Sequence, residues 1–176
     1  EGTLSLTGEG TVTSVRAEND SQLAESSSVI RVGDNDGDGG RDAALIIGED
    51  VTISAPATYG ASVFGSKTTE TVTVFGTIEA VPAAAIAGNG SAGYEGTTII
   101  IKDGAVLESG SDEINENPAI YHPQAGELII EGGTISGASG IEMKAGTLTI
   151  TGSPTITATA EVDHNKNSNG PSTKGY

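Results

Sequence analysis

The sequence ELIIEGGTISG at residues 127–137 decides the fold, and TLTITGSPTITA at residues 147–158 repeats its pattern. In both segments aliphatic residues alternate with polar ones, a short turn interrupts the alternation, and the alternation then resumes. A period of two residues is typical of a β-strand with one buried face. Each segment is therefore predicted to form two short strands joined by a bend.

The same double strand recurs in looser form toward the N-terminus. The further copies lie at residues 3–14, 44–55, 71–80 and 98–109. Alignment of all the copies places one set of aliphatic residues at an equivalent inward position: Leu6, Ile47, Val74, Ile101, Ile130 and Ile150. The copies follow one another at intervals of roughly 20 to 40 residues, which is the length of one coil of a solenoid.

A third short strand is expected between most of these pairs. The candidate segments are residues 27–32, 60–65, 83–88, 118–123 and 139–144. Each coil would then hold three strands, and stacked coils would form three parallel sheets lined inside by aliphatic columns. The predicted fold is an all-β, right-handed parallel β-helix of about six irregular coils over residues 1–158. Residues 159–176 are predicted to be a polar tail that leads toward a further coil or is disordered.

The terminal coils carry no polar capping segment. Edge strands and apolar side chains are therefore expected to be open at both ends of the solenoid. The chain is interpreted as a piece of a longer protein, or as a protein whose coil ends are covered by a partner or by a second copy.

Composition narrows the classes of function. The 176 residues include 26 Gly, no Cys and no Trp, and the net charge is −16. Nucleic-acid binding needs a basic stripe that this chain lacks. No apolar run reaches the ~20 residues that cross a bilayer, and the lack of Cys excludes a disulfide scaffold. The expected location is extracellular, on a cell surface or on a virion surface, with no nucleic-acid partner and no membrane insertion.

The run AIYHPQAGELIIEGGTISGASGIEMKAGTLTITGSPTITA at residues 119–158 resembles a repeat of large surface proteins of gut Firmicutes and of the phages that infect them. More widely, the chain resembles the pectin-lyase-like parallel β-helices. This resemblance implies a secreted, repetitive solenoid that serves in adhesion or in contact with glycans.

That superfamily also has catalytic members, whose sequence motifs can be compared with this chain. Their hydrolases carry clustered Asp residues with Gly-His-Gly and Arg-x-Lys motifs, and none of these motifs occurs here. The carboxylates between residues 108 and 116 lie in a Gly/Ser/Asn-rich loop and are interpreted as solvated side chains rather than a glycosidase pair. The chain is predicted not to be an enzyme. The alternative is a divergent calcium-dependent polysaccharide lyase with Arg31 as its base.

The sharpest local motif is GDNDGDGGRD at residues 33–42. Asp34, Asp36 and Asp38 fall at positions 1, 3 and 5 of a calcium-loop pattern, and the Gly40 carbonyl and Asp42 fill positions 7 and 9. The usual bidentate Glu at position 12 is missing. A weak Ca²⁺ site is therefore expected. The alternative is an acidic insertion that binds no ion, because Asp and Gly also favour turns.

Tyr94, Tyr121 and His122 are the candidate residues for binding a ligand. Tyr94 lies in a Gly-rich loop, and Tyr121 and His122 follow a predicted strand. Aromatic rings can stack on sugars, although packing within a turn explains the same residues equally well. The predicted function is a non-catalytic adhesion or carbohydrate-contacting module, whose partner is a glycan or a host-surface ligand. The alternative is a purely structural fibre or decoration protein that associates through its coil ends.

Overall fold

The computed structural model describes residues 2–14, 28–33, 41–56, 58–65, 68–81, 83–89, 95–109 and 117–159. These residues form strands β1 to β17 and no helix. Consequently, none of them lies in a helix that could cross a membrane. The all-β prediction is confirmed for this part of the chain.

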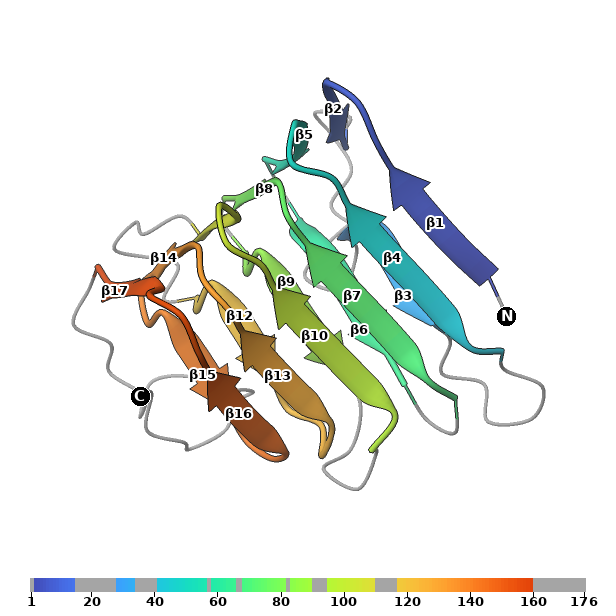
Figure 1. The fold of residues 1–176 in the computed structure, drawn as a ribbon, viewed down its shortest axis with the longest axis vertical. Coiled ribbons are helices and arrows are strands. Elements are labelled where there is room, and N and C mark those ends of the chain that lie inside the picture. Colours follow the sequence, from blue (N-terminus) through green and yellow to red (C-terminus); the bar gives the residue numbers. More distant parts are fainter. Residues whose placement is uncertain are drawn as a thin grey trace, which may run out of the picture.

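The strands form three sheets (Figure 1). Sheet 1 contains β1 (Gly2–Leu6), β4 (Ala43–Ile47), β7 (Glu70–Val74), β10 (Thr97–Ile101), β13 (Glu127–Ile130) and β16 (Thr147–Ile150). Sheet 2 contains β2 (Gly10–Thr13), β5 (Val51–Ala55), β8 (Thr77–Ala80), β11 (Val106–Ser109), β14 (Thr134–Gly137) and β17 (Thr155–Ala158). Sheet 3 contains β3 (Ser28–Gly33), β6 (Tyr59–Phe64), β9 (Ile86–Asn89), β12 (Ile120–His122) and β15 (Ile141–Met143).

Every described strand pairing is parallel, and each strand from β1 to β14 pairs with the strand three places later in the chain. The chain therefore visits the three sheets in rotation, and like strands stack in sequence order. Figure 1 shows sheet 1 running without interruption from β1 at the N-terminal end to β16 at the C-terminal end. This arrangement is consistent with a β-helical solenoid.

The predicted inward column of sheet 1 is confirmed. Its members are register partners in order: Leu6, Ile47, Val74, Ile101, Ile130 and Ile150. The inner members Ile47 and Ile101 are 0% exposed, whereas Ile150 in the last strand is 50% exposed. Burying one such side chain contributes roughly 1.5–3 kcal/mol. Sheet 2 supplies a matching column, in which Ile53, Ile78, Leu107 and Ile135 are 0% exposed.

The bends between sheets 1 and 2 depend on glycine. Gly133 joins β13 to β14 with φ +87°, a backbone conformation that L side chains rarely adopt. A Cβ at this position would also lie 2.6 Å from the Ala105 carbonyl oxygen of the preceding layer. The close stacking of successive bends therefore requires glycine here.

The predicted third strands are confirmed, with shorter bounds for β9, β12 and β15, the last of which covers Ile141–Met143. β9 begins at Ile86, later than expected. β12 covers only Ile120–His122, between Pro118 and Pro123. Proline has no N–H group to donate to a strand ladder, so the two prolines confine this strand. The predicted tail lies outside the described residues from residue 160 onward.

Position along the core column predicts the cost of a cavity. We expect Ile101→Ala to lower the free energy of unfolding by about 2–5 kcal/mol, because its side chain is enclosed by neighbours on both sides of the layer. Ile150→Ala, the same change at the open end of the same column, should cost less than about 1 kcal/mol. Urea unfolding followed by circular dichroism measures both, and equal losses would contradict the assignment of the column.

Candidate functional site

In chain order, the residues that the sequence singles out lie in or next to the links by which the chain passes from sheet 3 to sheet 1. Because the strands are parallel, the carboxyl ends of sheet 3 and the amino ends of sheet 1 meet at this corner. The acidic loop joins β3 to β4, Tyr94 lies in the link from β9 to β10, and His122 ends β12. Asp34, Asp36, Asp38, Gly40 and Tyr94 lie outside the described residues.

Asp42 is the member of the predicted calcium loop that the structure describes. Its side chain is exposed, and its Oδ1 accepts a hydrogen bond of 2.9 Å from the backbone N–H of Thr69. The backbone N–H of Ala43 donates in turn to the Thr69 carbonyl oxygen at 3.0 Å. Asp42 therefore ties the end of the acidic loop to the next layer. Among the described residues no group of three His, Cys, Asp or Glu side chains is placed to hold a metal ion.

Glu70, at the start of β7, is a buried carboxylate at this corner. It is 0% exposed, and its Oε1 accepts a hydrogen bond from the Thr68 hydroxyl. Its Oε2 has no hydrogen-bond partner among the described residues, and neither has Oγ1 of Thr97, its register partner in β10. Two polar atoms of neighbouring layers therefore face the interior without a described partner.

Glycines make room for the Glu70 side chain. A Cβ at Gly33 would lie 2.7 Å from Glu70 Cγ. A Cβ at Gly65 would lie 2.9 Å from Thr97 Oγ1 and closer still to Glu70 Oε2. Both glycines follow or end strands of sheet 3, so the corner is a cradle shaped for a carboxylate.

Burial raises the pKa of Glu70 above its ordinary value of 4.5, and repulsion from Asp42 raises it further. The hydrogen bond from Thr68 lowers the pKa of Glu70, but by less than burial raises it. The repulsion from Asp42 is the smallest of the three effects. The sequence search missed this residue. The signal was present, because Glu70 occupies the inward phase of the alternation ETVTV, where the other inward residues are valines.

His122 is a second buried ionisable group. It ends β12 of sheet 3, whereas Glu70 begins β7 of sheet 1. It is 0% exposed and pairs in register with Met143. Neither ring nitrogen reaches a partner with hydrogen-bond geometry among the described residues. Burial lowers the pKa of His122 below 6.5, and nearby backbone groups, including those of Ala145 and Glu127, only partly offset this. Full burial argues against direct contact between His122 and a glycan.

Tyr121 points the other way and is partly exposed. Lys144 Nζ lies 5.4 Å from the centre of its ring, within the range of a cation–π contact. Of the described residues predicted to bind a ligand, Tyr121 is the one whose ring a sugar can reach. Asp42 and Tyr121 do not form one site. Asp42 precedes β4 and Tyr121 lies in β12, just before β13, and strands β7 and β10 separate β4 from β13 in sheet 1.

Arg31, the base of the lyase alternative, lies on the exposed side of β3. Its guanidinium carbon is 4.0 Å from the centre of the Phe64 ring in the neighbouring strand β6. This stacking holds the side chain against sheet 3.

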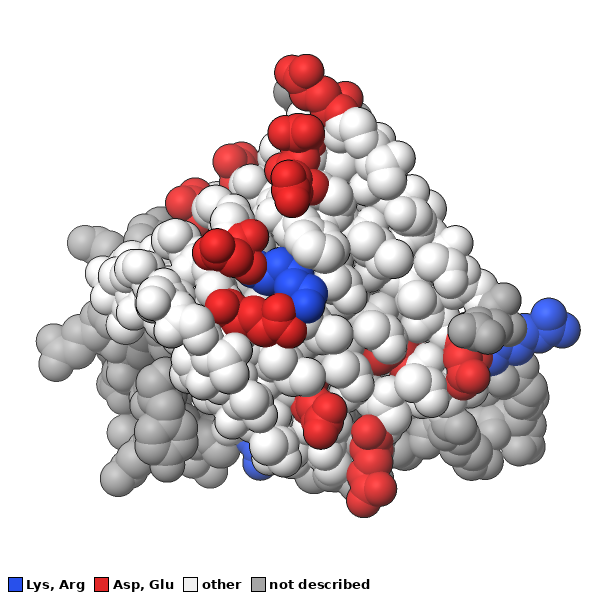
Figure 2. Space-filling view, viewed as in Figure 1, with Lys and Arg blue, Asp and Glu red and all other residues white. Residues whose placement is uncertain are grey.

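The outward face of sheet 1 is a further candidate surface, because it is almost free of charge. Its two outward rows run in register through Thr3, Ala44, Thr71, Thr98, Glu127 and Thr147, and through Ser5, Ile46, Thr73, Ile100, Ile129 and Thr149. Glu127, in the first row, is the single charged residue of the two rows together. Figure 2 shows this face as a largely uncharged surface with acidic side chains gathered toward its borders. In a chain of net charge −16, this surface stands out.

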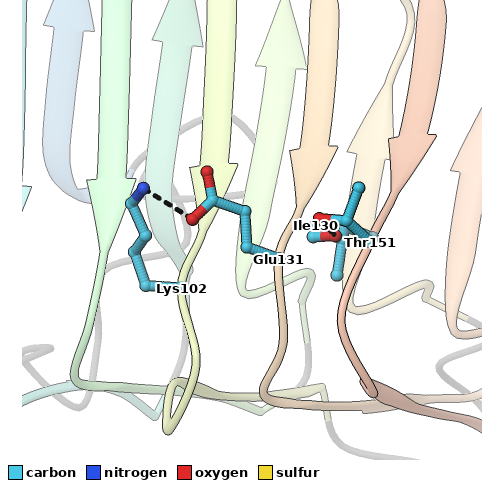
Figure 3. Close-up of polar contacts among 4 residues, drawn as sticks. All are labelled: Lys102, Ile130, Glu131 and Thr151. Atoms are coloured by element: carbon cyan, nitrogen blue, oxygen red, sulfur yellow. Dashed lines mark hydrogen bonds and ion pairs between the residues drawn. The ribbon is translucent and has the colours of Figure 1, made fainter.

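One border of this face is a ladder of polar side chains at the bends into sheet 2. Lys102, Glu131 and Thr151 follow β10, β13 and β16, and Figure 3 shows them in successive layers. Lys102 Nζ lies 2.7 Å from Glu131 Oε2, and Thr151 Oγ1 donates to the Ile130 carbonyl at 3.5 Å. Partly exposed ion pairs contribute about 0–1 kcal/mol. The ladder therefore aligns neighbouring layers more than it stabilises them.

Comparison with known proteins gives no assignment, because no protein-family model, curated protein or solved structure matches the chain. The resemblance of residues 119–158 to repeats of surface proteins therefore stays a prediction from the sequence. The geometry of the chain itself has to carry any functional proposal.

The buried carboxylate predicts a pH dependence. Because its folded pKa is raised, the unfolded chain loses this proton first as pH rises, and the folded state loses stability until pH passes the folded pKa. We expect Glu70→Gln to abolish this loss and to stabilise the protein at pH 7 by on the order of 1 kcal/mol. The exposed Glu127→Gln is the matched control. Parallel stability curves of wild type and Glu70→Gln between pH 4 and pH 7 would contradict the raised pKa.

The buried imidazole predicts the opposite dependence. Since the folded pKa of His122 lies below 6.5, the unfolded chain takes up this proton first as pH falls, and stability decreases below about pH 6.5. In a His164→Ala variant, His122 is the sole histidine, so its ring resonances can be titrated by NMR. We expect a midpoint below 6.5 that returns toward 6.5 in urea. A folded-state midpoint at or above 6.5 would show a solvated ring.

Proposed function

We propose that the chain is a non-catalytic β-solenoid module that contacts neutral glycans through the outward face of sheet 1. In this proposal the solenoid is a right-handed parallel β-helix of about six coils and belongs to a longer protein on a cell or virion surface. The handedness follows the strong preference of parallel crossover connections. The observation that carries the functional proposal is the nearly uncharged sheet face on a strongly acidic chain.

The chemistry of the face suits a neutral polysaccharide. Thr and Ser hydroxyls both donate and accept hydrogen bonds, as sugar hydroxyls do. The Ile46, Ile100 and Ile129 side chains lie in one outward row, with Thr73 between Ile46 and Ile100, and can pack against the C–H faces of sugar rings. Anionic partners are disfavoured by the surrounding carboxylates, which Figure 2 shows along the borders.

Repetition compensates for the weakness of each contact. Stacked strands repeat the same outward groups at about 4.8 Å, so an extended polymer can meet several layers at once. Contacts that are linked in this way gain avidity without any single deep pocket. This mode of binding needs no catalytic group, which agrees with the expectation that the chain is not an enzyme.

Calcium enters the proposal as a stiffening ion in the acidic loop. Asp42, the described end of that loop, is already fixed to Thr69. Oxygen ligands on a fixed loop end cost less entropy to order around an ion. We therefore propose that the loop binds Ca²⁺ weakly. Because the loop leads into β4 of sheet 1, Ca²⁺ is expected to change the retention of the protein on a glycan.

The glycan proposal is tested by depletion of the protein on insoluble neutral polysaccharides, such as cellulose, chitin and mannan, beside an acidic pectate. We expect retention on at least one neutral polymer and at least a tenfold loss in Thr71→Glu/Thr73→Glu, because a charge on the face must be desolvated on binding. Thr11→Glu/Thr13→Glu adds the same charges to sheet 2 and should lose less than twofold.

The same assay, run with calcium or with a chelator, tests the ion. Asp36→Ala/Asp38→Ala should make retention independent of calcium. No retention on any neutral polymer, or equal losses in the sheet 1 and sheet 2 variants, would refute the proposed function.

A structural role is the second candidate, favoured by the open ends. Leu4 is 47% exposed at the N-terminal end, and Leu148 and Ile150 are 37% and 50% exposed at the C-terminal end. Apolar edges of this kind pair readily with further strands.

A further inference from the structure

Phe75 continues the outward side of sheet 1 one step beyond the end of β7. Its backbone N–H donates to the Ile47 carbonyl oxygen at 2.8 Å, and the N–H of Lys102 donates to the Val74 carbonyl oxygen at 2.9 Å. The strand ladder therefore extends through Phe75. Because side chains alternate between the two faces of a strand, Phe75 shares the outward face with Thr73, and it is partly exposed there.

The two phenylalanines of the chain have different surroundings. Phe64 is 5% exposed, whereas Phe75 is partly exposed. In the preceding layer the ladder places Gly48 beside Phe75, and glycine has no side chain that could cover the ring. In the following layer Lys102 reaches away from Phe75 toward Glu131, whose Oε2 lies 2.7 Å from Lys102 Nζ (Figure 3). The ring of Phe75 is therefore open to solvent at the border of sheet 1.

The corner between sheets 1 and 2 lies wholly within the described residues. Its bends are residues 7–9, 48–50, 75–76, 102–105, 131–133 and 151–154. The position of Phe75 is thus defined by described neighbours in its own layer and in the layers on both sides.

Apolar side chains flank Thr73 on three sides of the outward face. Ile46 and Ile100 are its register partners in the two adjacent layers. A strand advances about 3.3 Å per residue, so Phe75 lies roughly 6–7 Å from Thr73 along the face. All four side chains are partly exposed. The centre of sheet 1 is therefore an apolar surface of about the width of a sugar ring with a hydroxyl in its middle.

We propose that Phe75 is the stacking residue of this face, and that the face selects β-1,4-linked glucan and chitin, whose sugar rings carry only equatorial substituents. This inference rests on the proposed function, because it names the class of neutral glycan that sheet 1 contacts. The face of an aromatic ring is electronegative and attracts the weakly positive C–H groups above and below such a sugar. Equatorial hydroxyls at the rim of the sugar then reach the Thr side chains.

Mannan provides the chemical contrast. Mannose differs from glucose in one axial hydroxyl, at C2. Successive sugars of a β-1,4 chain are turned over, so each side of a mannan chain presents this hydroxyl at alternate sugars. Against Phe75 and the neighbouring Ile side chains such a hydroxyl loses water without gaining a partner, which weakens binding.

A tryptophan at position 75 reports on stacking directly. The chain contains no Trp, so the emission of a Phe75→Trp variant comes from this position alone. We expect cellohexaose or chitohexaose to change the emission saturably, and mannohexaose to bind roughly tenfold more weakly. Adding Thr73→Glu to this variant should abolish the change, because the new charge must be desolvated on binding.

Retention of the full chain on cellulose and chitin tests the native ring. Phe75→Ala should lower the retention roughly tenfold, the scale of a central contact in an interface. Phe75→Leu keeps apolar bulk without a flat ring and should lose nearly as much, whereas Phe75→Tyr keeps the ring and should stay within about twofold of wild type. Val81→Ala removes apolar surface from a residue that is 52% exposed after β8 of sheet 2, and should change retention less than twofold. Thermal melts of each variant show whether it is folded.

The outcomes separate this inference from the proposed function. Retention of Phe75→Ala or Phe75→Leu equal to that of wild type, on a polymer that Thr71→Glu/Thr73→Glu no longer binds, would overturn the role of Phe75 and leave the glycan-binding face standing. Equal binding of mannohexaose and cellohexaose would overturn the selectivity alone. Failure of the wild-type chain to be retained on any neutral polymer would overturn both.

Discussion

Register is the constraint on which the whole structure depends. Each strand must place its inward aliphatic residues directly over those of the strand three places earlier, since side chains alternate between faces and a slip of one residue would turn the column outward. The columns through Ile47, Val74 and Ile101 and through Ile53, Ile78 and Leu107 show that this condition holds across layers. The core has almost no aromatic residues to fill gaps, so stacked aliphatic columns supply its close packing.

The bends make this register possible. Glycines such as Gly133 let the chain turn within a few residues and lie closely on the bend of the preceding layer. The corner between sheets 3 and 1 tolerates much more variation in link length, from short turns to the acidic loop. It also holds the buried Glu70 and His122, which titrate with opposite effects on stability. Links of variable length and these two buried polar groups therefore share one corner.

Charge is distributed in a way that separates the surfaces of the molecule. Carboxylates border sheet 1, while its outward rows keep Thr, Ser and Ile. The C-terminal end, in contrast, is apolar and concave. A hydroxyl-rich face suits a neutral polymer through many shallow contacts. The charge of the chain is therefore concentrated away from the outward rows of sheet 1.

The sequence by itself determined the stacking. The doublets with period two and the aligned set from Leu6 to Ile150 were enough to predict three parallel sheets and the register within sheet 1, because both follow from local alternation. It also predicted the third strands, although β9, β12 and β15 are shorter than the predicted segments.

Only the tertiary structure decided which polar residues are buried. Glu70 and His122 look like ordinary strand and turn residues in sequence, and their burial depends on Gly33, Gly65 and other layers far away in the chain. It likewise decided that the outward rows of sheet 1 align Thr, Ser and Ile from layer to layer. Local alternation specifies which face of a strand is buried, but desolvation and open edges depend on what the other layers place beside it.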